Sequence, residues 1–478
     1  MAGQIGTAGR LPLRPEDRDR LRVRAAEAVR RARRHGEALA AITVPLPADA
    51  DPTAIAAASR RPGEAWFSFE QADRDRFALA GLGCVAAIDE RGPDRFAAAA
   101  RRWRALAERA ACDDPDGPRG SGPVAVGGFA FASDGGGAPH WGGYEPASLH
   151  VPEAAMARRS DEVLLTLAAL ARPDDVPDEI VARLEARAAE LHERPLPLLD
   201  PDPAGRFKVV SAMPPEHYEA AVARAVERIR AGAFDKIVLA REVQVHAPAP
   251  HDAPALLGVL REAFPSCHVF CAARGDGAFI AASPELLVRR EGLRAGTLAL
   301  AGSTRRSADP AVDDHLGEQL LRSDKDREEQ AIVSRRIVRA LRPHSVWVTA
   351  AEEPVVVKMA NIQHLATPIR AQLAHPVSAV ELAGLLHPTP AVGGEPIAVA
   401  APLIPALEGL DRGWYAGPVG WTDRAEDGEF CVALRCALLT GPVARCYAGV
   451  GVVRDSDPAA ELAETEVKLQ ALLPVLAG

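Results

Sequence analysis

Lysine is rare in this chain, and two of its five lysines lie among neighbours that favour a chemical role. Lys and Arg together number 56, so Arg fills almost every position that needs only a positive charge. Arg stays protonated at physiological pH, whereas a buried Lys can lose its proton and then accept one. Lys236 begins the apolar run 236–240, and Lys468 ends the acidic segment 461–468. Chance is the better explanation for any one lysine taken alone, but these neighbours favour a role for Lys236 and Lys468.

Lys236 is a candidate general base, provided that its surroundings remove its proton. At an ordinary pKa of about 10.4, roughly one lysine in 2,500 is neutral at pH 7. A base at this position needs a pKa lower by about 2–3 units, which burial between strands or a nearby positive charge can cause. The residues that follow, Ile237-Val238-Leu239, supply the burial. The sequence therefore permits a catalytic Lys236.

Glu285 is a candidate general acid because of the residues before it. It follows Ser283-Pro284 at the end of an apolar, strand-like run. Pro284 cannot donate to a sheet ladder, so it ends the strand and turns Glu285 away from it. A carboxyl held beside apolar residues can keep its proton near neutral pH. The alternative is an ordinary solvated glutamate.

Three carboxylates on two expected helices form a candidate Mg²⁺ site. Glu461, Glu464 and Lys468 are spaced to lie on one face of a helix, and Glu329 is the carboxylate nearest the apolar side of another. Mg²⁺ takes few protein oxygens and keeps waters or substrate oxygens for its other positions. The glycines at 449 and 451 let a ligand approach the backbone of an apolar strand. The alternative is an exposed stripe of salt bridges.

The composition excludes several classes of partner. A net charge of −9 and a pI near 5.9 argue against nucleic acid or an anionic membrane. Seven scattered cysteines without a CxxC pair are expected to be reduced thiols. The longest apolar stretch, Val163 to Ala171, is too short to cross a bilayer, and no signal peptide is visible. We expect a cytoplasmic protein.

The pattern of elements predicts an α+β fold with large antiparallel β-sheets flanked by helices. Strands are expected at 236–246, 267–273 and 278–282, the last two joined by the hairpin signal Arg274–Gly277. Helices are expected at 15–35, 94–111, 177–193, 215–231, 253–264 and 312–341, with a last one starting at Asp457-Pro458. The Pro-rich run Pro195 to Pro203 predicts a boundary between an N-terminal part, 1–206, and a catalytic region, 207–478. We expect the two parts to be intertwined in one structural domain.

Several ordered blocks from about 207 to 475 resemble the chorismate-utilising enzymes, and within them the isochorismate synthases, especially the menaquinone-pathway type. The N-terminal part is similar through weaker blocks, including Gly127-Gly128-Phe129-Ala130-Phe131. The stronger blocks are Phe234 to Arg241, Ala282 to Leu287, Leu300 to Ser303, Ser323 to Gln330, Gln363 to Leu365, Leu386 to Gly394, Asp411-Arg412, Ala416 to Trp421, Leu434 to Cys436, Tyr447 to Val453 and Glu461 to Lys468.

The resemblance implies the fold of anthranilate synthase component I and a set of site roles. Lys236 would activate a water that attacks C2 of chorismate, and Glu285 would protonate the departing C4 hydroxyl. Glu329 and Glu464 would bind Mg²⁺, with Glu461 nearby. The remaining substrate-binding residues would hold the carboxylates (Arg435, Lys468 and the backbone of Gly302 and Gly449) or line the ring (His364 and Ala391). The chain departs from the family at Gln330, where His is usual.

The resemblance thus predicts an isomerase, an isochorismate synthase that depends on Mg²⁺ and is a monomer. Anthranilate and aminodeoxychorismate synthases share the fold but lack a lysine at the position of Lys236. Salicylate synthases keep Lys236 and Glu285 and then eliminate pyruvate, so they are the main alternative. The block 127–131 favours isochorismate as the released product. An inactive homologue that only binds a partner is a third possibility, which the full set of acid, base and metal residues disfavours.

Overall fold

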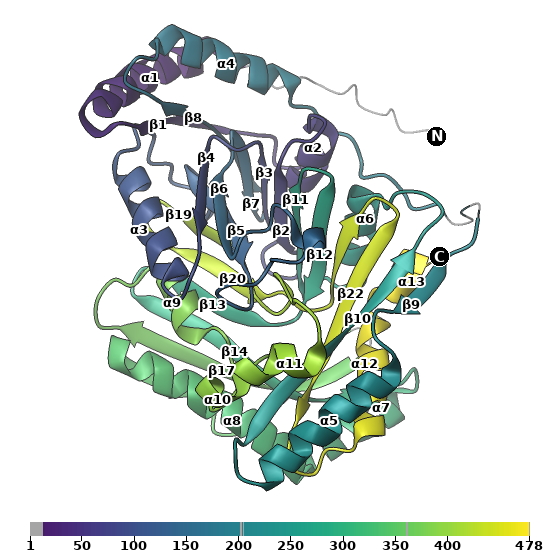
Figure 1. Cartoon of the computed structure of the whole chain (residues 1–478). Helices are drawn as coiled ribbons and strands as arrows, with labels where there is room; N and C mark the ends of the chain where they lie inside the picture. Colours follow the sequence, from purple (N-terminus) through teal and green to yellow (C-terminus); the bar gives the residue numbers. More distant parts are fainter. Residues whose placement is uncertain (1–12, 201–202, 204, 360–361, 478) are drawn as a thin grey trace.

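Two large antiparallel sheets form the framework of the chain (Figure 1). The structure is a computed structural model that describes residues 13–200, 203, 205–359 and 362–477. The first sheet has 12 strands among these residues, and the second has 10. In both sheets the neighbouring strands run antiparallel, for example β10 with β22 and β5 with β19. The predicted α+β class with large antiparallel sheets is confirmed.

The strands of the 12-stranded sheet are, in spatial order, β1 (Ala38–Pro45), β8 (Glu162–Ala171), β7 (Ala154–Arg159), β3 (Phe77–Leu82), β2 (Trp66–Gln71), β11 (His268–Arg274), β12 (Gly277–Ser283), β21 (Cys436–Thr440), β22 (Val443–Val452), β10 (Lys236–His246) and β18 (Gly394–Glu395), with β9 (Lys208–Ser211) paired to β10. Those of the 10-stranded sheet are β15 (Ser345–Ala350), β17 (Ile362–Leu373), β14 (Arg294–Arg305), β13 (Leu286–Glu291), β20 (Gly428–Val432), β19 (Pro418–Asp423), β5 (Val124–Phe129), β6 (Ala147–Val151) and β4 (Ala86–Glu90), with β16 (Val355–Lys358) paired to β17.

Each sheet contains strands from both parts of the chain, and the two groups of strands meet along one seam, between β2 and β11 in the larger sheet and between β5 and β19 in the smaller one. Phe69 of β2 lies opposite Phe270 of β11, and Gly127 of β5 lies opposite Gly420 of β19. The predicted boundary at residue 206 falls between α4 and β9, and part of the Pro-rich run that suggested it lies outside the described residues. The two parts therefore share both sheets, and each of the two hydrophobic core clusters contains residues from both parts.

Helices cover the sheets from outside and border the space between them (Figure 1). α5 and α12 pack beside β10 and β22, α8 packs on β14 and β17, and α3 packs on α9. The helices are α1 (Pro15–His35), α2 (Pro52–Ser59), α3 (Arg95–Glu108), α4 (Pro177–Glu190), α5 (Pro215–Arg230), α6 (Ala253–Ala263), α7 (Pro310–Arg322), α8 (Asp324–Leu341), α9 (Ala379–Leu386), α10 (Ile397–Ala400), α11 (Ile404–Glu408), α12 (Pro458–Leu469) and α13 (Leu473–Ala477).

The prediction of one continuous helix over 312–341 was wrong. The stretch 312–341 is two helices, because Ser323 is extended (φ −69°, ψ 112°) between α7 and α8. Its hydroxyl accepts a hydrogen bond from the Asp326 amide at 3.3 Å, so it caps α8. The apolar periodicity continues across the break and hides it. The start of α12 was predicted correctly, since Asp457 caps it and Pro458 is its first residue.

Two further predictions concern cysteines and membrane segments. All seven cysteines are free, which confirms the reduced thiols. In the described part of the chain, each helix is too short or too polar to cross a bilayer.

Candidate active site

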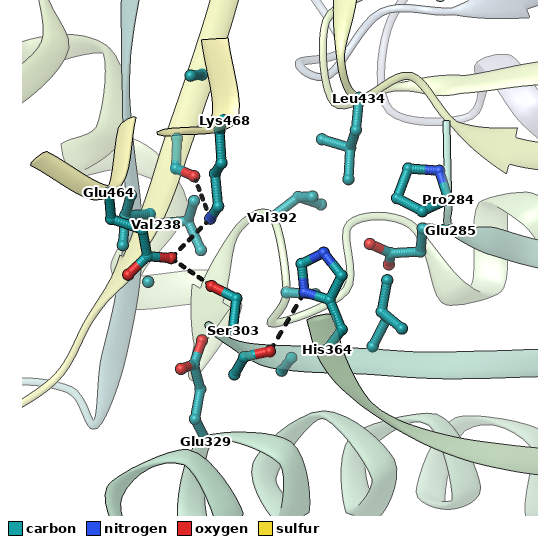
Figure 2. A pocket seen from close by; sticks show the side chains of 18 of the residues that line it. Val238, Pro284, Glu285, Ser303, Glu329, His364, Val392, Leu434, Glu464 and Lys468 are labelled. Carbon is teal, nitrogen blue, oxygen red and sulfur yellow. Dashed lines mark hydrogen bonds and ion pairs between the residues drawn. The ribbon is translucent and has the colours of Figure 1, made fainter. Parts of the chain in front are cut away.

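A pocket of about 880 Å³, counting the space at its mouth, lies where the ends of the two sheets meet α8 and α12. Nine of the eleven predicted site residues line it (Glu285, Gly302, Glu329, His364, Ala391, Arg435, Gly449, Glu464 and Lys468). Figure 2 shows Glu464 and Lys468 on one side of this pocket, Glu285 on the other, and His364 between them. Lys236 and Glu461 lie behind its wall.

Lys236 is fully buried and points at Glu329. Its Nζ lies 2.7 Å from Glu329 Oε1, and this ion pair compensates the cost of burying the ammonium. β10 positions Lys236, and the first turns of α8 position Glu329. Gly451 makes room for the pair, because a Cβ there would lie 2.5 Å from Glu329 Oε1 and 2.8 Å from Lys236 Cε. The sequence predicted the burial of this lysine but not its carboxylate partner.

Glu285 is a buried acid that keeps its proton at neutral pH. It is 3% exposed and lies in the turn between β12 and β13. Burial raises its pKa to about 8, although Lys236, Lys468 and a hydrogen bond with Thr389 act in the opposite direction. Its backbone is fixed by hydrogen bonds with Ser283 Oγ (3.3 Å) and Val432 N (3.0 Å).

Glu464 and Lys468 of α12 form an ion pair across the pocket from Glu285. Lys468 Nζ lies 3.0 Å from Glu464 Oε1 and donates to the carbonyl of Gly449 at 2.9 Å. Ser303 Oγ donates to the same carboxylate oxygen at 2.8 Å. Burial acts to raise the pKa of Glu464, but Lys468 and Ser303 hold it below its usual value. Glu464 is therefore a carboxylate at neutral pH.

Arg435 and His364 form a buried donor–acceptor chain. His364 Nδ1 lies 3.2 Å from the carbonyl of Gly302, and Arg435 Nη2 lies 2.7 Å from His364 Nε2. Since Arg can only donate, Nε2 accepts and Nδ1 carries the proton. Burial, Arg435 and Lys468 together hold the pKa of His364 well below its usual value, so the ring is neutral. Within the described residues, Arg435 Nη1 has no hydrogen-bond acceptor, which leaves a buried donor for an anionic ligand.

The backbone conformation at position 302 requires glycine. Its φ is +71°, at a bulge where β14 shifts register against β17. A Cβ there would also lie 3.0 Å from the Asp326 Cβ. Asp326, Ser303 and Lys325 line the pocket and were missing from the predicted site. Lys325 had a signal in the sequence, because it is one of the five lysines.

Glu461 and Gln330 lie outside the pocket lining. Glu461 is 2% exposed and its Oε1 accepts from Lys325 Nζ at 3.2 Å. Gln330 Nε2 donates to the carbonyl of Ala299 (2.9 Å) and to Thr367 Oγ1 (3.0 Å). Gln330 therefore ties α8 to β14 and β17, the elements that carry Gly302 and His364.

Two carboxylates, Glu329 and Glu464, face the pocket from different helices and form their contacts through Oε1. Among the residues that the structure describes, no three His, Cys, Asp or Glu side chains are close enough together to hold a metal ion. Two carboxylates suit Mg²⁺, which is commonly bound by one or two of them together with water and substrate oxygens. The residues present fit such an ion.

Comparisons with known proteins agree over most of the chain. The chorismate binding enzyme family matches residues 24–477. The salicylate biosynthesis isochorismate synthase of Pseudomonas aeruginosa is 36% identical over 406 residues, 85% of this chain and 84% of that protein. The isochorismate synthase MenF of Bacillus subtilis is 32% identical over 357 residues, 75% of each chain.

Solved structures show the same fold. The structure of MenF, the menaquinone-specific isochorismate synthase from Escherichia coli, superposes with a TM-score of 0.77 at 27% identity over 95% of this chain and 99% of that one. Anthranilate synthase component I from Streptococcus pneumoniae, at 18% identity and a TM-score of 0.64, shares the fold alone.

Proposed function

The chain belongs to the chorismate-binding enzyme family, and we infer from this that it is an isochorismate synthase, an isomerase that converts chorismate to isochorismate. Its named relatives are isochorismate synthases, including proteins described for salicylate biosynthesis and as menaquinone-specific. The observation that carries the proposal is that Glu285, an acid that keeps its proton at neutral pH, lines the same pocket as Glu329, the carboxylate that pairs with the buried Lys236.

Lys236 is the base and Glu285 is the acid. Lys236 accepts a proton from a water that attacks C2 of chorismate, the ring double bonds shift, and the C4 hydroxyl departs. Glu285 donates its proton to that hydroxyl, which leaves as water. A pKa of about 8 suits this task, because the acid is protonated at neutral pH yet can release its proton to a developing hydroxide.

Three cationic or polar groups hold the substrate's two carboxylates. Arg435 offers its free Nη1, Lys468 offers its ammonium, and the Gly302 backbone approaches closely because it lacks a side chain. These charges concentrate a positive field in a chain whose net charge is −9. Neutral His364 keeps the Arg435 guanidinium in place and lines the ring.

Glu329 and Glu464 would hold Mg²⁺, with Glu461 behind them pairing Lys325. When bound, Mg²⁺ would supply positive charge to a substrate carboxylate. Glu329 would hold the ion while its Oε1 lies 2.7 Å from Lys236 Nζ, so it links the base to the side of the pocket that would hold Mg²⁺.

The test is incubation of the protein with chorismate and Mg²⁺, followed by chromatography of the products. The expected product is isochorismate, formed by the wild type and not by Glu285→Gln. Salicylate together with an equal amount of pyruvate would identify a salicylate synthase instead. Binding of chorismate without any product would refute the proposed activity.

A further inference from the structure

A second cavity, as large as the active pocket, lies next to it. Its volume is about 870 Å³, against about 880 Å³ for the pocket described above. It is bounded by the start of α5, the middle of β10, the loop after α11 and the segment 138–140. α5, α11 and β10 pack against one another, and Figure 1 shows the two helices beside this strand of the larger sheet. The proposed reaction uses none of these residues.

The acidic side chains around this cavity already have their partners. Glu408 is bonded by Arg412 and by the Ala240 amide at 2.7 Å. Asp411 accepts from three backbone amides, those of Gly136 (3.0 Å), Ala138 (2.9 Å) and Gly413 (2.9 Å). Glu242 accepts from Gln244 (2.8 Å) and Arg445 (2.7 Å). The cavity therefore has little to offer a cationic ligand.

Two donors around the cavity are without acceptors. His140 Nε2 and Arg241 Nε are buried and have no hydrogen-bond partner in the described part of the chain. The terminal nitrogens of Arg241 already donate to Glu466, Thr465 (3.3 Å) and Ser211 (3.0 Å), so Arg241 offers a ligand its Nε alone. Burial also lowers the pKa of His140, so its neutral ring can donate from Nε2. An unpaired buried donor costs free energy that a ligand oxygen would recover.

The rest of the wall is apolar or aromatic. Met213, Tyr218, Ala221, Leu239 and Leu407 contribute to it. An apolar wall with a few convergent donors is the usual form of a small-molecule site. We propose that this cavity binds a monocyclic carboxylic acid, with the ring against the apolar wall and the carboxylate at His140 and Arg241.

The cavity is linked to the active pocket through one buried ion pair. Glu408 in the cavity wall lies 3.0 Å from Arg412 Nε. Arg412 in turn donates to the carbonyls of Val392 (2.8 Å) and Val238 (2.9 Å), and both valines line the active pocket. A ligand that shifts Glu408 therefore changes the active pocket, and by linkage the substrate changes the affinity of the second site. This coupling to turnover rests on the proposed function, whereas the binding itself does not.

The test uses 2-hydroxybenzoate as the probe in isothermal titration calorimetry. Met213→Trp fills the cavity from its rim, where Met213 is 39% exposed, and His140→Leu removes a donor. Both variants are expected to weaken the affinity for 2-hydroxybenzoate at least tenfold. Met213→Trp does so by filling the space, and His140→Leu by removing a hydrogen bond to the charged carboxylate. Val209→Trp makes a similar change on exposed β9, outside the cavity lining, and is expected to bind like the wild type. Benzylamine, of similar size and opposite charge, is expected not to bind there.

The kinetic arm asks whether the second site changes turnover. At saturating chorismate, 2-hydroxybenzoate is expected to change kcat in the wild type and in Val209→Trp but not in Met213→Trp. The second site would be overturned if 2-hydroxybenzoate bound the wild type and both cavity variants with equal stoichiometry and affinity. It would also be overturned if 2-hydroxybenzoate bound none of them. Unaltered kcat with a confirmed second site would overturn the coupling. Absence of chorismate turnover would refute the proposed function and leave the titration result standing.

Discussion

Replacing Glu285 by Gln should abolish activity. It should also make the fold more stable than that of the wild type, by an amount that grows as the pH rises. Folding raises the pKa of Glu285 from its ordinary value of 4.5 to about 8, chiefly by burial. Between these two values the folded chain binds more protons than the unfolded chain, so the wild type loses stability as the pH rises. Each pKa unit corresponds to about 1.4 kcal/mol, so the full window is worth about 5 kcal/mol. Gln has the same shape and no proton to lose, so it avoids this cost.

The measurement is urea unfolding of the wild type and Glu285→Gln at pH 5.5, 6.5 and 7.5. The free energy of unfolding of the variant minus that of the wild type should rise by about 2–3 kcal/mol over this range. Glu318→Gln, at a side chain that is 59% exposed, serves as the matched control and should show no such rise. Parallel pH profiles for the wild type and Glu285→Gln would refute the inference that burial keeps this acid protonated. In the active enzyme the same group predicts that kcat/KM falls as the pH passes about 8, since the acid form disappears.

Three further substitutions test the site. Lys236→Arg should keep the fold but lower kcat at least a hundredfold, since Arg cannot act as a base; an active variant would remove Lys236 from that role. Glu329→Ala should lose Mg²⁺-dependent turnover, measured by titrating Mg²⁺ at fixed chorismate, and unchanged Mg²⁺ dependence would place the ion elsewhere. Gly451→Ala should lower kcat/KM about a hundredfold, because the new Cβ displaces the Lys236–Glu329 pair. Gly296→Ala is the control and should stay active, since nothing lies within 4 Å of a Cβ at that position. Equal activity in the two variants would contradict the tight packing at position 451.

Much of the fold and most of the site could be predicted from the sequence, for identifiable reasons. Periodicity and caps located β10 and the start of α12, because those signals are local. Pro284 and its apolar neighbours left a solvated glutamate as the alternative at Glu285, the resemblance to the family implied the acid, and the structure buries the side chain.

What the sequence did not provide depends on contacts between distant residues. The Lys236–Glu329 ion pair joins residues 93 positions apart, and no local pattern records it. The break at Ser323 was missed because one extended residue interrupts a periodicity that resumes at once. The second cavity has no signal in the sequence, since four separate segments contribute to its walls.

The seam at which early and late strands pair in each sheet has a consequence for biosynthesis. β5 leaves the ribosome long before β19, its hydrogen-bonding neighbour, has been translated. At roughly 5–20 residues per second, β5 waits for tens of seconds with one edge uncovered. An uncovered edge is a template for pairing with other nascent chains. Production of this enzyme should therefore be sensitive to chaperone supply and growth temperature, and separately expressed halves should be insoluble unless made together.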